Sequence, residues 1–92
     1  MEEIFETVKS ILSLDKLELP SLTNSDKYLK KCNLSIQLLN NCFIPYYLRA
    51  ICKIFSEEEE TDILEDIKYS YELIGKEIQR YIYIYNFIKN EN

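Results

Sequence analysis

The stretch that decides the fold is residues 64–88, LEDIKYSYELIGKEIQRYIYIYNFI. Apolar residues recur here at alternating spacings of three and four, which is typical of an α-helix with one apolar seam. The seam consists of Leu64, Ile67, Tyr71, Ile74, Ile78, Tyr81, Tyr85 and Ile88. The pattern predicts a helix over about residues 57–89, roughly 50 Å long. Since the rest of the chain is too short to cover such a helix, either Gly75 bends it or its end projects.

The residues at the beginning of this helix are typical of a helix N-terminus. Ser56 is followed by four glutamates, so its side chain could accept a hydrogen bond from the amide of Glu59 in a capping box. Between residues 57 and 66 there are seven acidic residues and no basic one. This acidic run suits the positive end of the helix dipole, and the alternative interpretation is a docking patch for a basic partner.

Three shorter helices are expected upstream, over about residues 2–13, 25–41 and 45–55. Their apolar residues recur with helical spacing, and Pro45 is well placed at the first position of the third. Arg49 and Lys53 are expected to face water, and the second helix to be central. The fold class is therefore all-α: one domain over residues 1–92, an antiparallel four-helix bundle with a long C-terminal helix.

The segment Tyr81-Ile82-Tyr83-Ile84-Tyr85 has the alternation and the residue types of a β-strand. No second strand-like run exists elsewhere in the sequence to pair with it. We therefore expect the segment to be helical.

The composition argues against an enzyme. The 92 residues include no His, the commonest general base and metal ligand, and one Gly, too few for a phosphate-binding loop. The three cysteines, Cys32, Cys42 and Cys52, form no CxxC pair and are expected to be small buried residues in a reducing compartment. No catalytic residue, metal or cofactor is predicted.

The charge and the N-terminus restrict the partners and the location. A net charge of −5 argues against nucleic acid, because a phosphate-binding face needs concentrated Lys and Arg. The acidic start Met1-Glu2-Glu3 lacks the basic region of a signal peptide, and no apolar run is long enough to span a bilayer. A cytoplasmic protein without a transmembrane segment is expected.

The C-terminal part of the long helix is the first candidate for a binding surface. As a helix it shows apolar residues on nearly every side, whereas a surface helix normally shows one stripe. Either this end is buried among the other helices, or it is an exposed patch that binds a partner. The candidate residues are Arg80, Tyr81, Ile82, Tyr83, Ile84 and Phe87.

A second candidate is the segment Phe43-Ile44-Pro45-Tyr46-Tyr47, from which Tyr46 is taken as a partner-binding residue. Two consecutive tyrosines begin a helix here, and only one of them can face the core. The alternative is a packed corner between two helices.

The stretches NLSIQLLNN (33–41) and IPYYLRAI (44–51), with an acidic helix start at Ser56, resemble the small immunity proteins of class II bacteriocins. The lactococcin A type is the most similar in pattern, and the shared features cover about residues 25–80. The resemblance implies a cytosolic four-helix bundle that engages a membrane receptor, a mannose phosphotransferase permease, once bacteriocin is bound. It also implies that specificity lies in the tyrosine-rich end.

Two other functions fit the same sequence. In one, residues 64–88 pair across a coiled-coil interface, so that the chain is a homodimer or a structural subunit. In the other, the chain is a phage or viral inhibitor that occludes a host protein. Both use the long helix as the contact surface.

Overall fold

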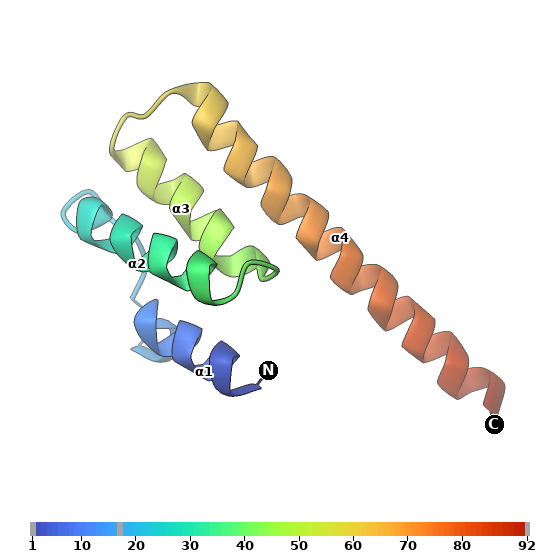
Figure 1. Ribbon diagram of the computed structural model, residues 1–92. Coiled ribbons are helices and arrows are strands. Elements are labelled where there is room, and N and C mark those ends of the chain that lie inside the picture. Colours follow the sequence, from blue (N-terminus) through green and yellow to red (C-terminus); the bar gives the residue numbers. More distant parts are fainter. Residues whose placement is uncertain (1, 17, 92) are drawn as a thin grey trace.

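The computed structural model describes residues 2–16 and 18–91. It contains α1 (Glu2–Ile11), the short 3₁₀ helix η1 (Leu14–Lys16), α2 (Ser25–Leu38), α3 (Phe43–Phe55) and α4 (Glu60–Glu91) (Figure 1). Within these two ranges there is no strand, and the tyrosine-isoleucine alternation lies inside α4. The all-α prediction is confirmed.

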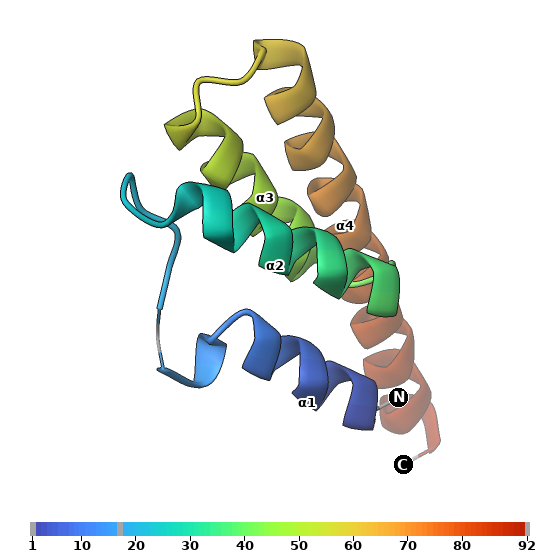
Figure 2. The ribbon, with the colours of Figure 1, turned by 60° about the vertical axis from the view of Figure 1, so that its left-hand side comes forward.

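The four helices are arranged in the order of the chain. The backbone of α2 lies close to α1 and α3, and that of α3 to α2 and α4, whereas the backbones of α1 and α4 do not approach one another in the described part of the chain. Successive helices run in opposite directions, as Figures 1 and 2 show. The antiparallel arrangement agrees with the expected bundle, but the first and last helices do not close it. α2 and α3 therefore share the central position that was predicted for the second helix alone.

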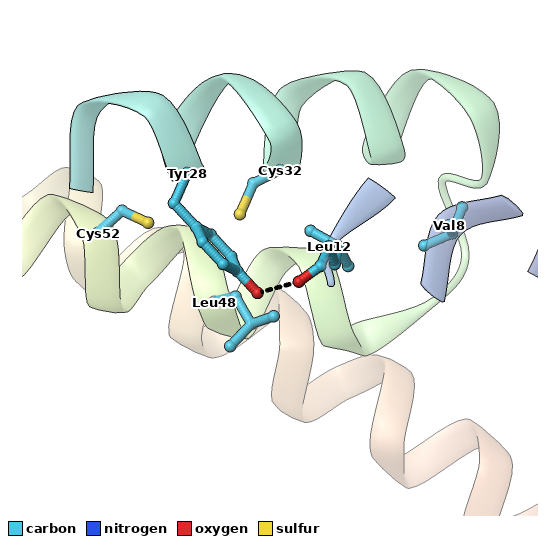
Figure 3. Close-up of a cluster of buried hydrophobic side chains, with 6 residues drawn as sticks. All are labelled: Val8, Leu12, Tyr28, Cys32, Leu48 and Cys52. Carbon is cyan, nitrogen blue, oxygen red and sulfur yellow. Dashed lines mark hydrogen bonds between the residues drawn. The ribbon is translucent and has the colours of Figure 1, made fainter. Parts of the chain in front are cut away.

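The hydrophobic core lies between α1, α2 and α3 (Figure 3). Its buried side chains are Val8, Leu12, Tyr28, Cys32, Leu48 and Cys52. Burial raises the pKa of both core thiols, so that Cys32 and Cys52 stay protonated at neutral pH and act as small apolar residues. α4 contributes no residue to this cluster.

The Tyr28 hydroxyl ties α2 to the end of α1. It donates a hydrogen bond to the carbonyl oxygen of Leu12 at 2.6 Å and lies 3.3 Å from that of Glu18 (Figure 3). Burial raises the pKa of Tyr28 to about 12. The hydroxyl thus remains protonated, and a donor, throughout the neutral range.

Replacing Tyr28 with phenylalanine should lower the free energy of unfolding by about 1–2 kcal/mol. The substitution keeps the ring but leaves the buried carbonyl of Leu12 without its donor. Urea unfolding followed by circular dichroism measures the loss. Tyr47→Phe is the matched control, since Tyr47 is exposed on α3. Equal losses in both variants would show that the Tyr28 hydroxyl has no structural role.

Several helix ends differ from the predictions. The capping box was wrong: Ser56 follows α3, its amide donates to the carbonyl of Cys52, and α4 begins only at Glu60. Glu57 has φ 57°, so the chain leaves the helical conformation directly after Ser56. Ser13, with φ 57°, lies beyond the end of α1 in the same way. In both places one residue in the left-handed region ends a helix earlier, or starts the next one later, than periodicity alone indicates.

α4 is continuous through Gly75. Its 32 residues give a length of about 48 Å at 1.5 Å per residue, close to the 52 Å longest dimension of the molecule. Figure 1 shows its C-terminal half extending past the other three helices. Of the two expected alternatives, the projecting end is the one observed.

Candidate protein-binding surface

α4 faces α3 with a stripe of mixed polarity, half polar and half apolar. The buried residues are Asp66, Ser70 and Leu73, and the half-buried ones are Ile63, Ile74 and Glu77. This stripe lies about a quarter turn around the helix from the centre of the apolar seam. The seam residues other than Ile74 are therefore exposed: Leu64, Ile67, Tyr71, Ile78, Tyr81, Tyr85 and Ile88.

An ion-pair cluster joins α4 to α3 and explains why the charged Asp66 faces inward. Asp66 is 5% exposed, and its carboxylate accepts hydrogen bonds from Arg49 at 2.7 and 2.8 Å. The Lys53 ammonium lies 3.0 Å from the same carboxylate. Arg49 also donates to the side chain of Asn33 on α2. The expectation that Arg49 and Lys53 face water was wrong, because both turn towards Asp66.

This cluster also sets the protonation state of its carboxyl group. Burial by itself raises the pKa of Asp66, but the hydrogen bonds and charges of Arg49 and Lys53 outweigh burial and lower it below its ordinary value. The same interaction raises the pKa of Arg49. Asp66 is therefore ionised throughout the neutral range.

Tyr46 does not lie on a binding surface, which corrects the prediction for this residue. It is buried at the start of α3, and its ring centroid lies 4.6 Å from that of Tyr69 on α4. Its hydroxyl donates to the carbonyl of Asn40 at 3.0 Å. The packed-corner alternative describes this segment, and the neighbouring Tyr47 is the tyrosine that faces outward.

The C-terminal candidates are exposed together. From residue 78 to residue 90, every side chain of α4 is exposed. We call six of them the terminal patch: Arg80, Tyr81, Ile82, Tyr83, Ile84 and Phe87. Tyr81 and Tyr83 are the most accessible of the patch's apolar residues, at 71% and 72%. The alternative in which this end is buried among the other helices does not hold.

A groove separates the beginning of the terminal patch from the helical body. It has a volume of about 820 Å³, and its walls include Phe5 of α1, Leu39 and Cys42 before α3, Ile44 of α3 and Tyr81 of α4. Burial raises the pKa of the Cys42 thiol, so this wall is neutral at physiological pH. The groove is also lined by Glu6, Asn41, Glu77 and Arg80, so it places both apolar and charged walls next to the patch.

The described residues show neither a group of metal-ligand side chains nor an unpartnered buried polar side chain. No three His, Cys, Asp or Glu side chains are grouped there as metal ligands would be. Every buried side-chain polar atom in the same residues has a hydrogen-bond partner. No helix of the described chain combines the length and the apolar character needed to cross a bilayer.

The chain thus belongs to the class of small all-α proteins, with a helical body and one long helix whose apolar end lies outside that body. No protein-family model matches the sequence, and neither the curated proteins nor the solved structures contain a match.

Proposed function

We propose that the chain is a non-enzymatic binding protein whose terminal patch docks onto another protein. The observation that carries this proposal is the run of exposed residues 78–90, eight of which are aliphatic or aromatic: Ile78, Tyr81, Ile82, Tyr83, Ile84, Tyr85, Phe87 and Ile88. Monomeric proteins in water seldom leave so large a contiguous apolar surface uncovered, and such surfaces mark interaction sites.

The chemistry of the patch suits a protein partner. Tyrosine rings bury a large area at a low entropic cost, and their hydroxyls tolerate water while the partner is absent. Arginine, present here as Arg80, is also enriched at the centres of protein interfaces. Because the segment is already helical, little conformational entropy is lost when it enters a groove on the partner.

A specific version of this function is bacteriocin immunity in the cytoplasm, at a membrane receptor complex. It is supported by the resemblance of residues 25–80 to immunity proteins of class II bacteriocins, and by the position of the terminal patch at the end of α4. In this version the body presents the helix and the patch supplies the contact with the receptor.

Expression of the protein in a strain sensitive to a class II bacteriocin should confer resistance, and Tyr83→Ala with Phe87→Ala should reduce it. Both rings are exposed, at 72% and 57%, so their loss removes contact area without disturbing the body. We expect at least a 10-fold (roughly 1.4 kcal/mol) weaker interaction. Growth in the presence of bacteriocin and binding to receptor-containing membranes measure the effect.

Tyr47→Ala, an exposed tyrosine on α3, is the matched control and should protect as well as the original chain. Absence of protection against every class II bacteriocin would end the immunity version. Protection that persists fully in the Tyr83→Ala, Phe87→Ala variant would instead show that the terminal patch is not the contact surface.

A further inference from the structure

The apolar seam of α4 is a second surface that the fold leaves uncovered. Its residues follow a heptad pattern over residues 64–88, yet α3 packs on a different face of the helix. Tyr71, at 76% exposure, lies in the half of α4 that the body supports, where shorter or more polar residues would be expected on an outer face. The seam and the terminal patch share only Tyr81, and the other seam residues lie outside the patch.

Gly75 is a further unexplained residue on the flank of this seam. It lies within a continuous helix, has no positive φ, and a Cβ at this position would meet nothing within 4 Å. Neither a turn nor a close approach inside the chain requires a glycine, although glycine weakens a helix relative to alanine. The missing side chain opens the seam next to Ile74, where a residue of another helix could enter.

We propose that α4 pairs with α4 of a second copy of the chain in an antiparallel coiled coil. In this pairing Leu64 lies opposite Ile88 of the other copy and Ile67 lies opposite Tyr85. Tyr71 then faces Tyr81, and Ile74 faces Ile78 beside the opening at Gly75. This inference rests on the proposed function in one respect, namely that the exposed part of α4 binds protein. It adds that the protein bound by the seam is a second copy of the chain.

The size and symmetry of the seam fit a second copy. Seven seam side chains are between 38% and 76% exposed. At roughly 200 Å² for a fully exposed side chain of this size, covering them buries on the order of 800 Å² per chain. A stable interface needs about 800 Å² per partner. In an antiparallel pair, the N-terminal half of each seam lies against the C-terminal half of the other. These two identical contacts close the assembly as a two-fold dimer.

Charge determines the direction of the pair. A parallel pair would place the acidic residues 57–66 of the two chains side by side, and like charges at that distance repel. An antiparallel pair places this segment next to the C-terminal end of the other helix, where the charges of Lys89 and Glu91 balance, so the two acidic runs are kept apart. The helix dipoles then also oppose one another, which is the favourable arrangement.

The test is the oligomeric state of the full chain at about 10–100 µM, by sedimentation or light scattering. The original chain should be a dimer, and Ile78→Glu should raise the dimer dissociation constant by about 100-fold or more, since two charges enter the apolar interface. Gln79→Glu is the matched control, because it adds the same charge at the next, polar position. Circular dichroism should show equal helix content in all three proteins.

A second variant separates dimerisation from folding. Gly75→Arg introduces a better helix former and fills the opening beside Ile74, so it should weaken the dimer without reducing the helix content of the monomer. A monomeric original chain, or a dimer that survives both Ile78→Glu and Gly75→Arg, would overturn the proposal.

Cross-linking tests the direction of the helices in a Cys42→Ser background. Leu64→Cys mixed with Ile88→Cys should form a disulfide between the two variants. Leu64→Cys alone should not cross-link to itself, and efficient cross-linking of that kind would contradict the antiparallel arrangement.

The dimer and the partner site can fail independently. Tyr83 and Phe87 lie on sides of α4 away from the seam, so the Tyr83→Ala, Phe87→Ala variant should remain dimeric while it loses the partner. A monomeric chain that still needs these two rings for binding would overturn the dimer and leave the proposed function standing.

Discussion

Replacing Asp66 with alanine should lower the free energy of unfolding by about 2–4 kcal/mol. The substitution removes the carboxylate that pairs with Arg49 and Lys53, and it leaves both cations partly buried without a partner. Loss of one member of a buried ion pair typically costs about 3–5 kcal/mol, and partial solvent access to the two cations reduces that figure. For a chain of this size, such a loss is a large fraction of the total stability.

Urea unfolding at neutral pH measures this loss, and Asp62→Ala is the matched control, because Asp62 is an exposed acid one turn earlier on α4. The control should change the unfolding free energy by less than about 0.5 kcal/mol. Equal effects of the two substitutions would show that the Arg49–Asp66 pair does not hold α4 on α3.

The same pair predicts a pH dependence. Because the folded state lowers the pKa of Asp66, the folded protein binds fewer protons at this site than the unfolded chain does. The stabilisation is complete above the ordinary carboxyl pKa of about 3.9 and is lost as the pH falls through the lower folded value. Asp66→Asn should remove this part of the acid sensitivity, which thermal unfolding between about pH 2 and pH 6 would reveal.

Ending the chain after Gln79 should abolish partner binding and leave the body folded. The deleted end contributes no residue to the core between α1, α2 and α3, and none of its side chains up to residue 90 is buried. We expect the unfolding free energy to change by less than about 1 kcal/mol. Urea unfolding and partner binding are measured on the same preparation, so that lost binding cannot be attributed to unfolding.

A chain ending after Phe87 serves as the control for this truncation, since it keeps the whole terminal patch. It should bind nearly as well as the full-length protein. A loss of more than about 2 kcal/mol in the shorter chain would contradict the observation that the end of α4 lies outside the body.

Helical periodicity was sufficient to predict the four helices, since each carries apolar residues at spacings of three and four. It also predicted that α4 is too long for the body. The strand-like spelling of residues 81–85 was correctly assigned to the helix because a strand needs a partner. These features depend on local sequence, which is why they could be predicted.

The face of α4 that meets α3 could not be predicted in the same way. Periodicity indicated that the apolar seam would pack on α3. Instead, Asp66 on a neighbouring face of α4 forms ion pairs with Arg49 and Lys53, which lie one turn apart on α3. That match joins residues far apart in the sequence, and periodicity within one helix does not reveal it. The signal in the sequence was the pair of cations four residues apart on an otherwise apolar helix, because two such cations can pair with one acid on a neighbouring helix.

The candidate site was predicted in part for a similar reason. All six residues of the terminal patch lie together on one exposed segment, because they are close in sequence on one helix. Tyr46 was misplaced because its burial depends on Tyr69 and Asn40, which lie in other parts of the chain. Whether Tyr46 or Tyr47 faces inward is decided by how α3 packs against α4, and not by the sequence of α3 alone.

The order in which the helices touch has a consequence for folding kinetics. The backbone of each helix lies close only to the helices that precede and follow it in the chain, so most helix–helix contacts close loops of moderate length. Proteins with such local contacts fold within microseconds to milliseconds and open from their ends. Amide protons of α1 should therefore exchange with solvent before those of α2 and α3, whose helices each have neighbours on both sides.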